Sequence, residues 1–397
     1  MKPEGMNWMG KDPTLLNTNI TVAVDNGNSF VKACYDAINQ TFMFPNVTVQ
    51  SDQKRKVILN QGEPIDNLDL EIVSPSIPEG FGRHFQIGVL ASRHPRAQAI
   101  IGHKAAQMKS QRPETMITTL GALAYAIATK HAADIENGVK RIRAQVKLGI
   151  GLPIAEVSEA QAFSDKLTRG VHMVAFRSTP KFEGVEVEMQ ISLPDGINVD
   201  NVSGIIDLAS EPKSTLMDKS FGVADLGGID LDIAFFKPGL QLDDYTSTGF
   251  RINLNDIITR IRKDFNAQMG QDLIKSDVNV IERIVNKDYE VKWQGLVKGN
   301  IGDIANLYLT ELARDVLERV LDAWAEAPEA EEFLFIGGGA TILASYIKDV
   351  ERQGRPLRFD TQEHSQLRNL RGTFRSLESA MDSGVEVAVS APGDETV

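Results

Sequence analysis

The chain has 397 residues, and its 42 basic and 54 acidic side chains give a formal net charge of −12 at pH 7. This length exceeds what one compact core holds and predicts two or three domains. The acidic balance argues against a broad nucleic-acid-binding surface and against an anionic membrane as a partner.

Three features indicate where the protein resides. The single cysteine, Cys34, excludes an internal disulfide and is typical of a reducing cytosol. The polar opening residues lack the pattern of a signal peptide, and no apolar run reaches the ~20 residues needed to cross a bilayer. We therefore expect a cytoplasmic protein with no membrane partner.

The first part of the chain is predicted to be rich in strands. Residues 1–18 are polar and broken by prolines and glycines, so we expect a flexible lead-in. Residues 20–43 predict a meander of strands separated by turn residues, and the mixed, charged residues 45–98 predict a small inserted subdomain. Helical apolar spacing follows over residues 115–132, and residues 143–154 predict a buried strand.

The later part of the chain repeats this order of elements. Residues 201–212 predict a connecting helix, and residues 230–245 predict strands. Helices are predicted over residues 250–265 and 298–324, and residues 331–350 combine an apolar strand, three glycines and a helix. Strands followed by helices, twice, predict two related α/β domains rather than one doubly wound sheet.

An acidic turn follows the first apolar strand, in "VAVDNGNS" (residues 22–29). Asn26 and Gly27 predict a two-residue hairpin turn because both residue types tolerate positive φ. Asp25 at the end of the strand would repel a bare phosphate, so we expect a cation between them, and Mg²⁺ suits one or two carboxylates combined with phosphates. Lys32 on the outgoing strand can supply positive charge to the phosphates.

A second acidic turn, "GVADLGGIDLD" (residues 222–232), repeats the arrangement at Asp225. Gly227 and Gly228 allow the backbone to approach a ligand closely. Either turn alone is better explained as an ordinary hairpin. Their repetition favours a functional role, in which one turn from each domain holds the phosphates and the metal.

A third feature is the strand "FLFI" running into Gly337, Gly338 and Gly339 and then a helix. The helix-terminal N–H groups would lie beside whatever occupies this turn, and the missing side chains suit a flat nucleoside. A tight strand-to-helix turn explains the glycines equally well. The chain contains neither a G-x-x-x-x-G-K-[ST] phosphate loop nor a G-x-G-x-x-G motif after a strand, which disfavours the common nucleotide-binding folds.

Taken in order, "DNGNS", "KLGIGLPIAE", "ADLGGIDLDI" and "FIGGGAT" resemble the phosphate-1, first-connector, phosphate-2 and adenosine motifs of the actin, sugar-kinase and heat-shock-chaperone ATPases. Within this superfamily, "FQIGVLA", "GLPIAE" and the compact length resemble the plasmid-segregating actin-like ATPases of the ParM/StbA type. The resemblance covers roughly residues 19–390 and implies an actin-like (ribonuclease H-like) α/β fold with a nucleotide cleft between two domains. The implied segments are domain I (19–208), domain II (209–375) and a segment returning to domain I (376–397).

The resemblance also implies roles for individual residues. The first phosphate loop would consist of Asp25, Gly27, Asn28, Ser29 and Lys32. The second loop would consist of Asp225, Gly227, Gly228 and Asp230, and the adenosine side of Gly249, Gly337, Gly338 and Gly339. Asp25 and Asp225 would hold Mg²⁺ through water.

Glu156 in "LPIAE" matches the acidic residue that orients or activates the attacking water, so Glu156 and Asp225 are the catalytic candidates. Glu156 is also explained as an acid in the first turn of a helix, favoured by the helix dipole. Two residues depart from the family pattern. Ile229 stands where a threonine is usual, and Ala380 stands where a glycine is frequent.

The expected cofactors are therefore ATP or GTP and Mg²⁺, and the expected activity is ATP hydrolysis coupled to filament assembly. A head-to-tail interface that does not close would give a filament. The expected partners are further copies of the chain and a DNA-binding adaptor protein that links the filament to a plasmid. The alternatives are a small-molecule kinase, which would need a base for a substrate hydroxyl, and a chaperone-like ATPase of the same superfamily.

Overall fold

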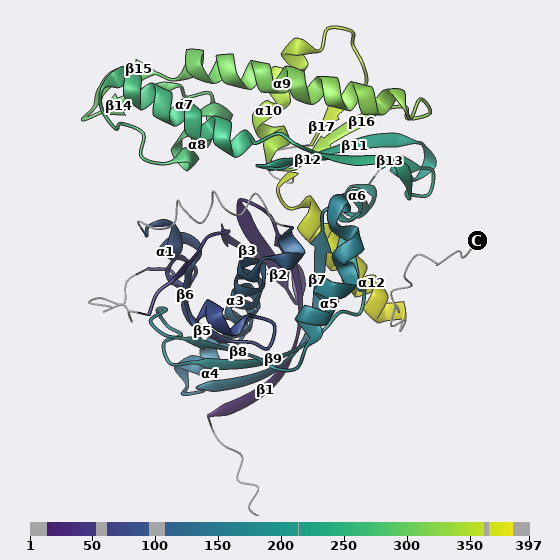
Figure 1. Cartoon of the computed structure of the whole chain (residues 1–397). Coiled ribbons are helices and arrows are strands. Elements are labelled where there is room, and N and C mark those ends of the chain that lie inside the picture. Colours follow the sequence, from purple (N-terminus) through teal and green to yellow (C-terminus); the bar gives the residue numbers. More distant parts are fainter. Residues whose placement is uncertain (1–13, 53–61, 95–107, 213, 361–364, 384–397) are drawn as a thin grey trace, which may run out of the picture. The chain divides into compact units, whose positions relative to one another are not determined.

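The computed structural model describes residues 14–52, 62–94, 108–212, 214–360 and 365–383 (Figure 1). The chain divides into two compact units. The first comprises residues 1–152, 158–198 and 376–397, and the second comprises residues 153–157 and 199–375. The predicted lead-in differs from the structure over residues 15–18, which belong to the first strand, while residues 1–13 lie outside the described residues.

The first unit is built on a large mixed sheet. Five of its strands run in the order β3-β2-β1-β7-β9, namely β3 (Ala37–Pro45), β2 (Phe30–Tyr35), β1 (Leu15–Asn26), β7 (Arg141–Leu152) and β9 (Glu186–Ser192). The first three form an antiparallel meander, and β7 and β9 continue the sheet in parallel to β1. The predicted meander and the predicted buried strand are therefore confirmed.

The described part of residues 45–98 extends this sheet and shares its core, whereas we predict a small inserted subdomain there. The additional strands are β8 (His172–Phe176), β5 (Asp69–Val73), β6 (His84–Ile87) and β4 (Thr48–Gln50), in that order outward from β9, and β10 (Ile197–Val199), which pairs with β7. The physical reason is that Leu70, Ile72 and Phe85 on these strands are buried in the same core as β1 and β7.

Helix α3 (Pro113–Lys130) packs on this sheet and is buried along most of its length. It confirms the predicted helix over residues 115–132. Shorter helices complete the unit, namely α1 (Gly88–Ser92), α4 (Ala132–Glu136) and α5 (Ala160–Thr168). Although α3 is rich in apolar residues, no helix in the described ranges is long and apolar enough to cross a membrane.

The second unit repeats the strand pattern of the first. Its sheet has the order β13-β12-β11-β16-β17, formed by β13 (Gln241–Arg251), β12 (Asp230–Lys237), β11 (Phe221–Leu226), β16 (Phe333–Ile336) and β17 (Leu357–Phe359). Again three antiparallel strands form a meander, and two strands follow in parallel to the innermost one. This repetition confirms the prediction of two related α/β domains.

Successive residues of a strand point to opposite faces of the sheet, and here both faces carry apolar side chains. Helices therefore cover both faces of the second sheet. Leu226, Phe235 and Phe333 pack under the helices α7 (Leu254–Met269), α8 (Asp277–Asn286), α9 (Gly302–Ala325) and α10 (Gly338–Val350). Phe221 and Phe236 face α6 (Asp200–Ala209), whose Ile205 and Leu208 belong to the same cluster. Residues 199–208 accordingly lie in the second unit, whereas we predict the domain boundary after residue 208.

Several elements have no counterpart in the sequence prediction, among them a hairpin before α9 and a helix near the end of the described residues. The hairpin of β14 (Glu290–Trp293) and β15 (Leu296–Asn300) precedes α9 and occupies the start of the predicted helix over 298–324. Its turn residues, Gln294 and Gly295, have φ values of 49° and 80°, which suit a two-residue hairpin turn. Helix α12 (Arg368–Ser383) passes from the second unit into the first after Arg375.

A buried histidine makes the stability of the first unit depend on pH. His172 is fully buried, its Nε2–H donates to the carbonyl of Leu167, and its Nδ1 accepts from the hydroxyl of Ser74. Burial lowers the pKa of His172 below its ordinary value of 6.5, against the smaller opposite effect of the bond to Leu167. Below pH 6.5, and down to the lowered pKa of the folded state, the unfolded chain binds a proton that the folded chain does not. Folding stability therefore falls as the pH falls through this window.

We expect His172→Gln to flatten this dependence. The difference in the free energy of unfolding between the original chain and the variant should shrink below pH 6.5, with a slope of at most ~1.36 kcal/mol per pH unit. Urea unfolding between pH 5 and pH 8 measures it. Parallel stability curves for the two proteins across that range would contradict the expectation.

Candidate functional site

The first acidic hairpin connects β1 to β2 through the three-residue loop Gly27–Ser29. Asp25 lies opposite Lys32 in the ladder, and the Lys32 Nζ is 2.7 Å from the Asp25 Oδ2. The ammonium group therefore compensates the carboxylate, which is 7% exposed. Lys32 and the loop residues Gly27, Asn28 and Ser29 are partly exposed beside it.

The predicted two-residue turn at Asn26 and Gly27 is wrong. Asn26 is the last residue of β1 and pairs with Val31, and neither Asn26 nor Gly27 has a positive φ. Gly27 is needed for a different reason, because a Cβ at this position would lie 2.9 Å from the carbonyl oxygen of Phe30.

A buried amide network holds this loop in place. The Asn26 amide nitrogen donates into the start of α3, at 3.0 Å from the hydroxyl oxygens of Thr118 and Thr119. The Asn46 side chain donates to the Asn26 Oδ1 and to the Gly27 carbonyl, each at 2.7 Å. The Asn46 backbone N–H also donates to the carbonyl of Ser29. Asn26 and Asn46 therefore connect the loop Gly27–Ser29 to α3 and to the residue that follows β3.

The second acidic hairpin connects β11 to β12 through Gly227–Ile229, a loop of the same length. The Gly227 N–H donates to the Asp230 carbonyl at 2.9 Å. The carbonyl of Gly228 accepts from the N–H of Asn255 at 2.8 Å, and that of Ile229 accepts from the N–H of Ile252 at 2.8 Å. The segment that begins α7 thus holds the second loop, as Asn46 holds the first.

Asp225 lies at the centre of the site in the second unit. Its Oδ2 accepts a hydrogen bond of 2.7 Å from the Asn369 amide on α12. Across the sheet, Asp225 pairs with Asp232, and Asp232 pairs with Gly249 on β13. A Cβ at Gly249 would lie 2.9 Å from the Asp232 Oδ1. The sheet therefore presents two carboxylates and a bare stretch of backbone side by side.

The three glycines at the start of α10 have different roles. A Cβ at Gly337 would lie 2.3 Å from the Asp225 Oδ1, and one at Gly339 would lie 2.7 Å from the Leu226 carbonyl oxygen. Gly337 also has a φ of 87°, which disfavours any side chain. Gly338 has only ordinary contacts at this position, with Gln366 at 3.7 Å. Two of the glycines thus let α10 approach the Asp225 hairpin, and Gly338 remains the candidate surface for a nucleoside.

Glu156 lies in the first turn of a short 3₁₀ helix (Ile154–Glu159), where its N–H donates to the Pro153 carbonyl at 2.8 Å. Residues 153–157 belong to the second unit, and the Ala155 Cβ is 3.8 Å from the position of a Cβ on Gly249. Glu156 is partly exposed.

The structure brings the predicted site residues together in two groups, one in each unit. The first group is Asp25, Gly27, Asn28, Ser29 and Lys32. The second group is Glu156, Asp225, Gly227, Gly228, Asp230, Gly249, Gly337, Gly338 and Gly339.

Sequence reasoning missed Asn46, Asp232 and Asn369. Asp232 lies two residues after Asp230 in "DLDIAF" and so on the same face of the strand, which means that strand alternation could have identified it. The sequence around Asn46 and Asn369 gives no such indication. Within α12, Gly372 leaves no room for a side chain, because a Cβ there would lie 1.6 Å from the Ser203 carbonyl oxygen on α6.

Two family models match the chain. Residues 23–196 match the N-terminal domain of actin-like proteins, and residues 221–369 match the Alp7A C-terminal domain. The chain belongs to the actin-like proteins. No curated protein matches the sequence of this actin-like protein.

Solved structures with the same fold cover nearly the whole of this actin-like protein. It is similar to Bacillus thuringiensis ParM with ATP, with a TM-score of 0.68, 19% identity, and coverage of 91% of this chain and 99% of that one. For the actin-like protein Alp7A the values are 0.69, 18%, 92% and 98%. For Ta0583, an archaeal actin homologue, they are 0.65, 16%, 91% and 100%. The predicted two-domain actin-like α/β fold is therefore confirmed.

We expect Asn46→Ala to destabilise the first hairpin of this actin-like protein. The substitution leaves the Asn26 Oδ1 and the Gly27 carbonyl without their shared donor, at a cost of about 1–3 kcal/mol in the free energy of unfolding. Asn39→Ala, at an exposed position on β3, is the matched control and should change little. Denaturant unfolding of both variants checks this, and equal stabilities would contradict the role of Asn46.

Proposed function

We propose that this chain is an ATPase that binds a magnesium nucleotide and assembles into filaments. The observation that carries the proposal is the repeated hairpin. In each unit the first strand of the same five-strand pattern carries an aspartate, Asp25 or Asp225, as its second-last residue. A three-residue loop follows, whose carbonyls accept hydrogen bonds from the rest of the unit. Two such loops suit one polyphosphate, because backbone N–H groups in turns can donate hydrogen bonds to an anion.

Nucleotide binding is supported by the second unit and by the relatives. Gly338 and Gly249 offer backbone without side chains near Asp225 and Glu156. Bacillus thuringiensis ParM has been solved with ATP, with ADP and with AMPPNP. We propose ATP or GTP as the ligand of this chain.

Magnesium fits the donor set. The described residues contain no cluster of three His, Cys, Asp or Glu side chains that could hold a metal directly. One carboxylate per hairpin, with Asp225 oriented by Asn369 and Asp25 compensated by Lys32, instead suits an ion that keeps most of its waters and completes its shell with phosphates. When bound, Mg²⁺ would neutralise charge on the β- and γ-phosphates.

The protein's own groups then have distinct tasks. The loops Gly27–Ser29 and Gly227–Ile229 position the phosphates through their backbone, and Lys32 supplies positive charge. Glu156 accepts a proton from the attacking water or orients it, and for this task its partial exposure in a short helix is suitable.

We further propose that the filaments segregate plasmid DNA in the cytoplasm. A chain with a net charge of −12 is poorly suited to broad contact with DNA, so a DNA-binding adaptor protein would make the link. Sedimentation with ATP, with ADP and without nucleotide tests assembly. Pelleting that requires ATP supports the proposal, and a chain that stays in solution under all three conditions contradicts it.

Replacing either hairpin aspartate should abolish hydrolysis without unfolding the protein. We expect Asp225→Asn and Asp25→Asn each to lower ATP turnover by about 10²-fold or more, because each removes one of the two carboxylates that hold the metal's water shell. Phosphate release at saturating Mg²⁺ and ATP measures this. Asp218→Asn, on a short 3₁₀ helix of the second unit, is the control. Full turnover in either hairpin variant would remove the metal assignment.

Glu156 should separate chemistry from binding. We expect Glu156→Ala to retain nucleotide affinity but to lower turnover by roughly 10²-fold, the usual scale for a general base. Filaments formed with ATP should then persist. Glu159→Ala, at the end of the same short helix, is the matched control. Weaker nucleotide binding with normal turnover per bound nucleotide would show that Glu156 has only a structural role.

A further inference from the structure

An apolar hairpin protrudes from the second unit. Residues 292–298 between Val291 and Gly299 are all exposed, and they include Trp293 at 41%, Leu296 at 64% and Val297 at 55% exposure. Trp293 and Leu296 are direct partners in the β14–β15 ladder and therefore share one face of the hairpin. An exposed Trp–Leu–Val group on a protruding turn is typical of an interaction site.

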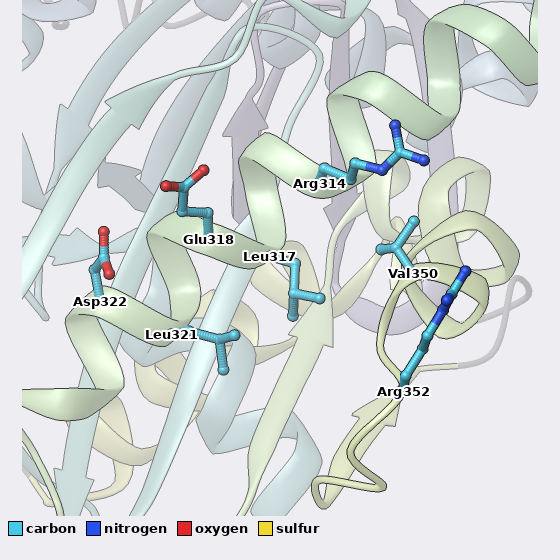
Figure 2. A pocket seen from close by; sticks show the side chains of 7 residues that line it. All are labelled: Arg314, Leu317, Glu318, Leu321, Asp322, Val350 and Arg352. Atoms are coloured by element: carbon cyan, nitrogen blue, oxygen red, sulfur yellow. The ribbon is translucent and has the colours of Figure 1, made fainter.

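A groove lined by apolar and charged side chains lies farther along α9, where α9 passes the end of α10 (Figure 2). Its volume is about 390 Å³, and its apolar lining consists of Leu317, Leu321 and Val350. This volume falls within the range of about 300–1,000 Å³ in which pockets accept compact ligands. A tryptophan side chain with a neighbouring leucine is a group of suitable size and chemistry.

The charges around the two features are complementary. Lys292 and Lys298 flank the tip of the hairpin, and the Lys292 Nζ lies 3.7 Å from the Oε2 of Glu290 at its base, in an ion pair that is largely exposed to solvent. Figure 2 shows Glu318 and Asp322 on one side of the groove and Arg314 and Arg352 on the other. Within the described part of the chain, none of these four groove side chains has an intramolecular ion pair or hydrogen bond.

The hairpin cannot reach the groove of its own chain. It precedes the first residue of α9, Gly302, whereas the groove lies along residues 314–322 of the same straight helix. At 1.5 Å per residue the two features are separated by roughly 20 Å or more along the helix axis. Figure 1 shows β14 and β15 beside the N-terminal end of α9, within the same unit.

We propose that the hairpin tip, formed by Trp293, Leu296 and Val297, docks into the α9–α10 groove of a second copy of this chain. Lys292 and Lys298 then pair with Glu318 and Asp322 of that copy. Because the hairpin tip and the groove are different surfaces of one unit, the contact is heterologous, and it builds an open filament when the rotation between copies does not close a ring. This inference rests on the proposed filament function and specifies the surface that carries it.

Two variants with complementary defects test the proposal. Trp293→Ser/Leu296→Ser removes the apolar side chains of the hairpin tip, and Leu321→Arg fills the groove. Each variant alone should show a critical concentration for ATP-driven assembly at least about 10-fold higher than that of the original chain, since central aromatic anchors dominate such interfaces. Mixed in equal amounts with ATP, the two variants should form a one-to-one heterodimer in analytical ultracentrifugation. The groove variant keeps an intact hairpin tip, and the hairpin variant keeps an intact groove.

Charge exchange provides a second test with exposed positions that do not endanger folding. Lys292→Glu/Lys298→Glu should raise the critical concentration, and combining it with Glu318→Lys/Asp322→Lys in one chain should restore it to near the original value. Val171→Ser is the matched control for exposed apolar area, since Val171 is 53% exposed in the first unit. All variants should bind a fluorescent ATP analogue as the original chain does.

The outcomes separate this interface from the function on which it rests. If the original chain fails to assemble with ATP, the proposed function falls and the interface falls with it. If the original chain assembles and the hairpin variants assemble equally well, the interface alone is overturned. Loss of assembly in the hairpin variants with normal assembly of the groove variants, or no rescue by charge exchange, shows that the hairpin docks elsewhere and also overturns the pairing.

Discussion

The close approach of α10 to the Asp225 hairpin is the constraint on which the candidate site of the second unit depends. Gly337 and Gly339 leave no room for a Cβ against the Asp225 carboxylate and the Leu226 carbonyl. Any larger residue would push the start of α10 away from β11, and the Asn369 amide that orients Asp225 from α12 would lose its geometry. Backbone packing, rather than a side-chain network, therefore sets the position of the acidic group.

The loops that follow the two aspartates are held in place by different contacts in the two units. In the first unit, a buried amide pair, Asn26 and Asn46, fixes the loop after Asp25, and in the second unit the segment that begins α7 holds the corresponding loop. The duplicated five-strand pattern thus supplies two similar hairpins, whose supports differ because different segments reach them. Outside the site, Gly372 allows α12 to lie directly on the backbone of α6, beside Arg368, whose guanidinium pairs with the buried Asp207.

Much of this arrangement is predictable from local sequence, and the rest depends on contacts between distant segments. The strand that carries Asp225, the glycine loop after it and helix α10 with its leading glycines are each encoded within a short stretch of sequence, so apolar runs and turn residues reveal them. Asn26 shows where such reasoning fails. Its side chain satisfies buried hydroxyls on α3, which outweighs the turn preference of an Asn-Gly pair. The support from Asn46 and Asn369 cannot be predicted, because nothing near either residue in the chain indicates its partner. The β14–β15 hairpin is missed because its strands are only four and five residues long and overlap the predicted helix at residues 298–300.

The central claim is that one nucleotide engages both acidic hairpins, and hydrogen–deuterium exchange of the full chain with and without Mg²⁺ and ATP tests it most directly. We expect slower exchange after ATP addition in peptides covering residues 25–32 and 225–232, together with residues 337–340, at the same nucleotide concentration. Peptides of the hairpin at residues 290–300 serve as an internal reference below the concentration at which the chain assembles. Protection confined to one unit, or protection that ignores both hairpins, would contradict the account.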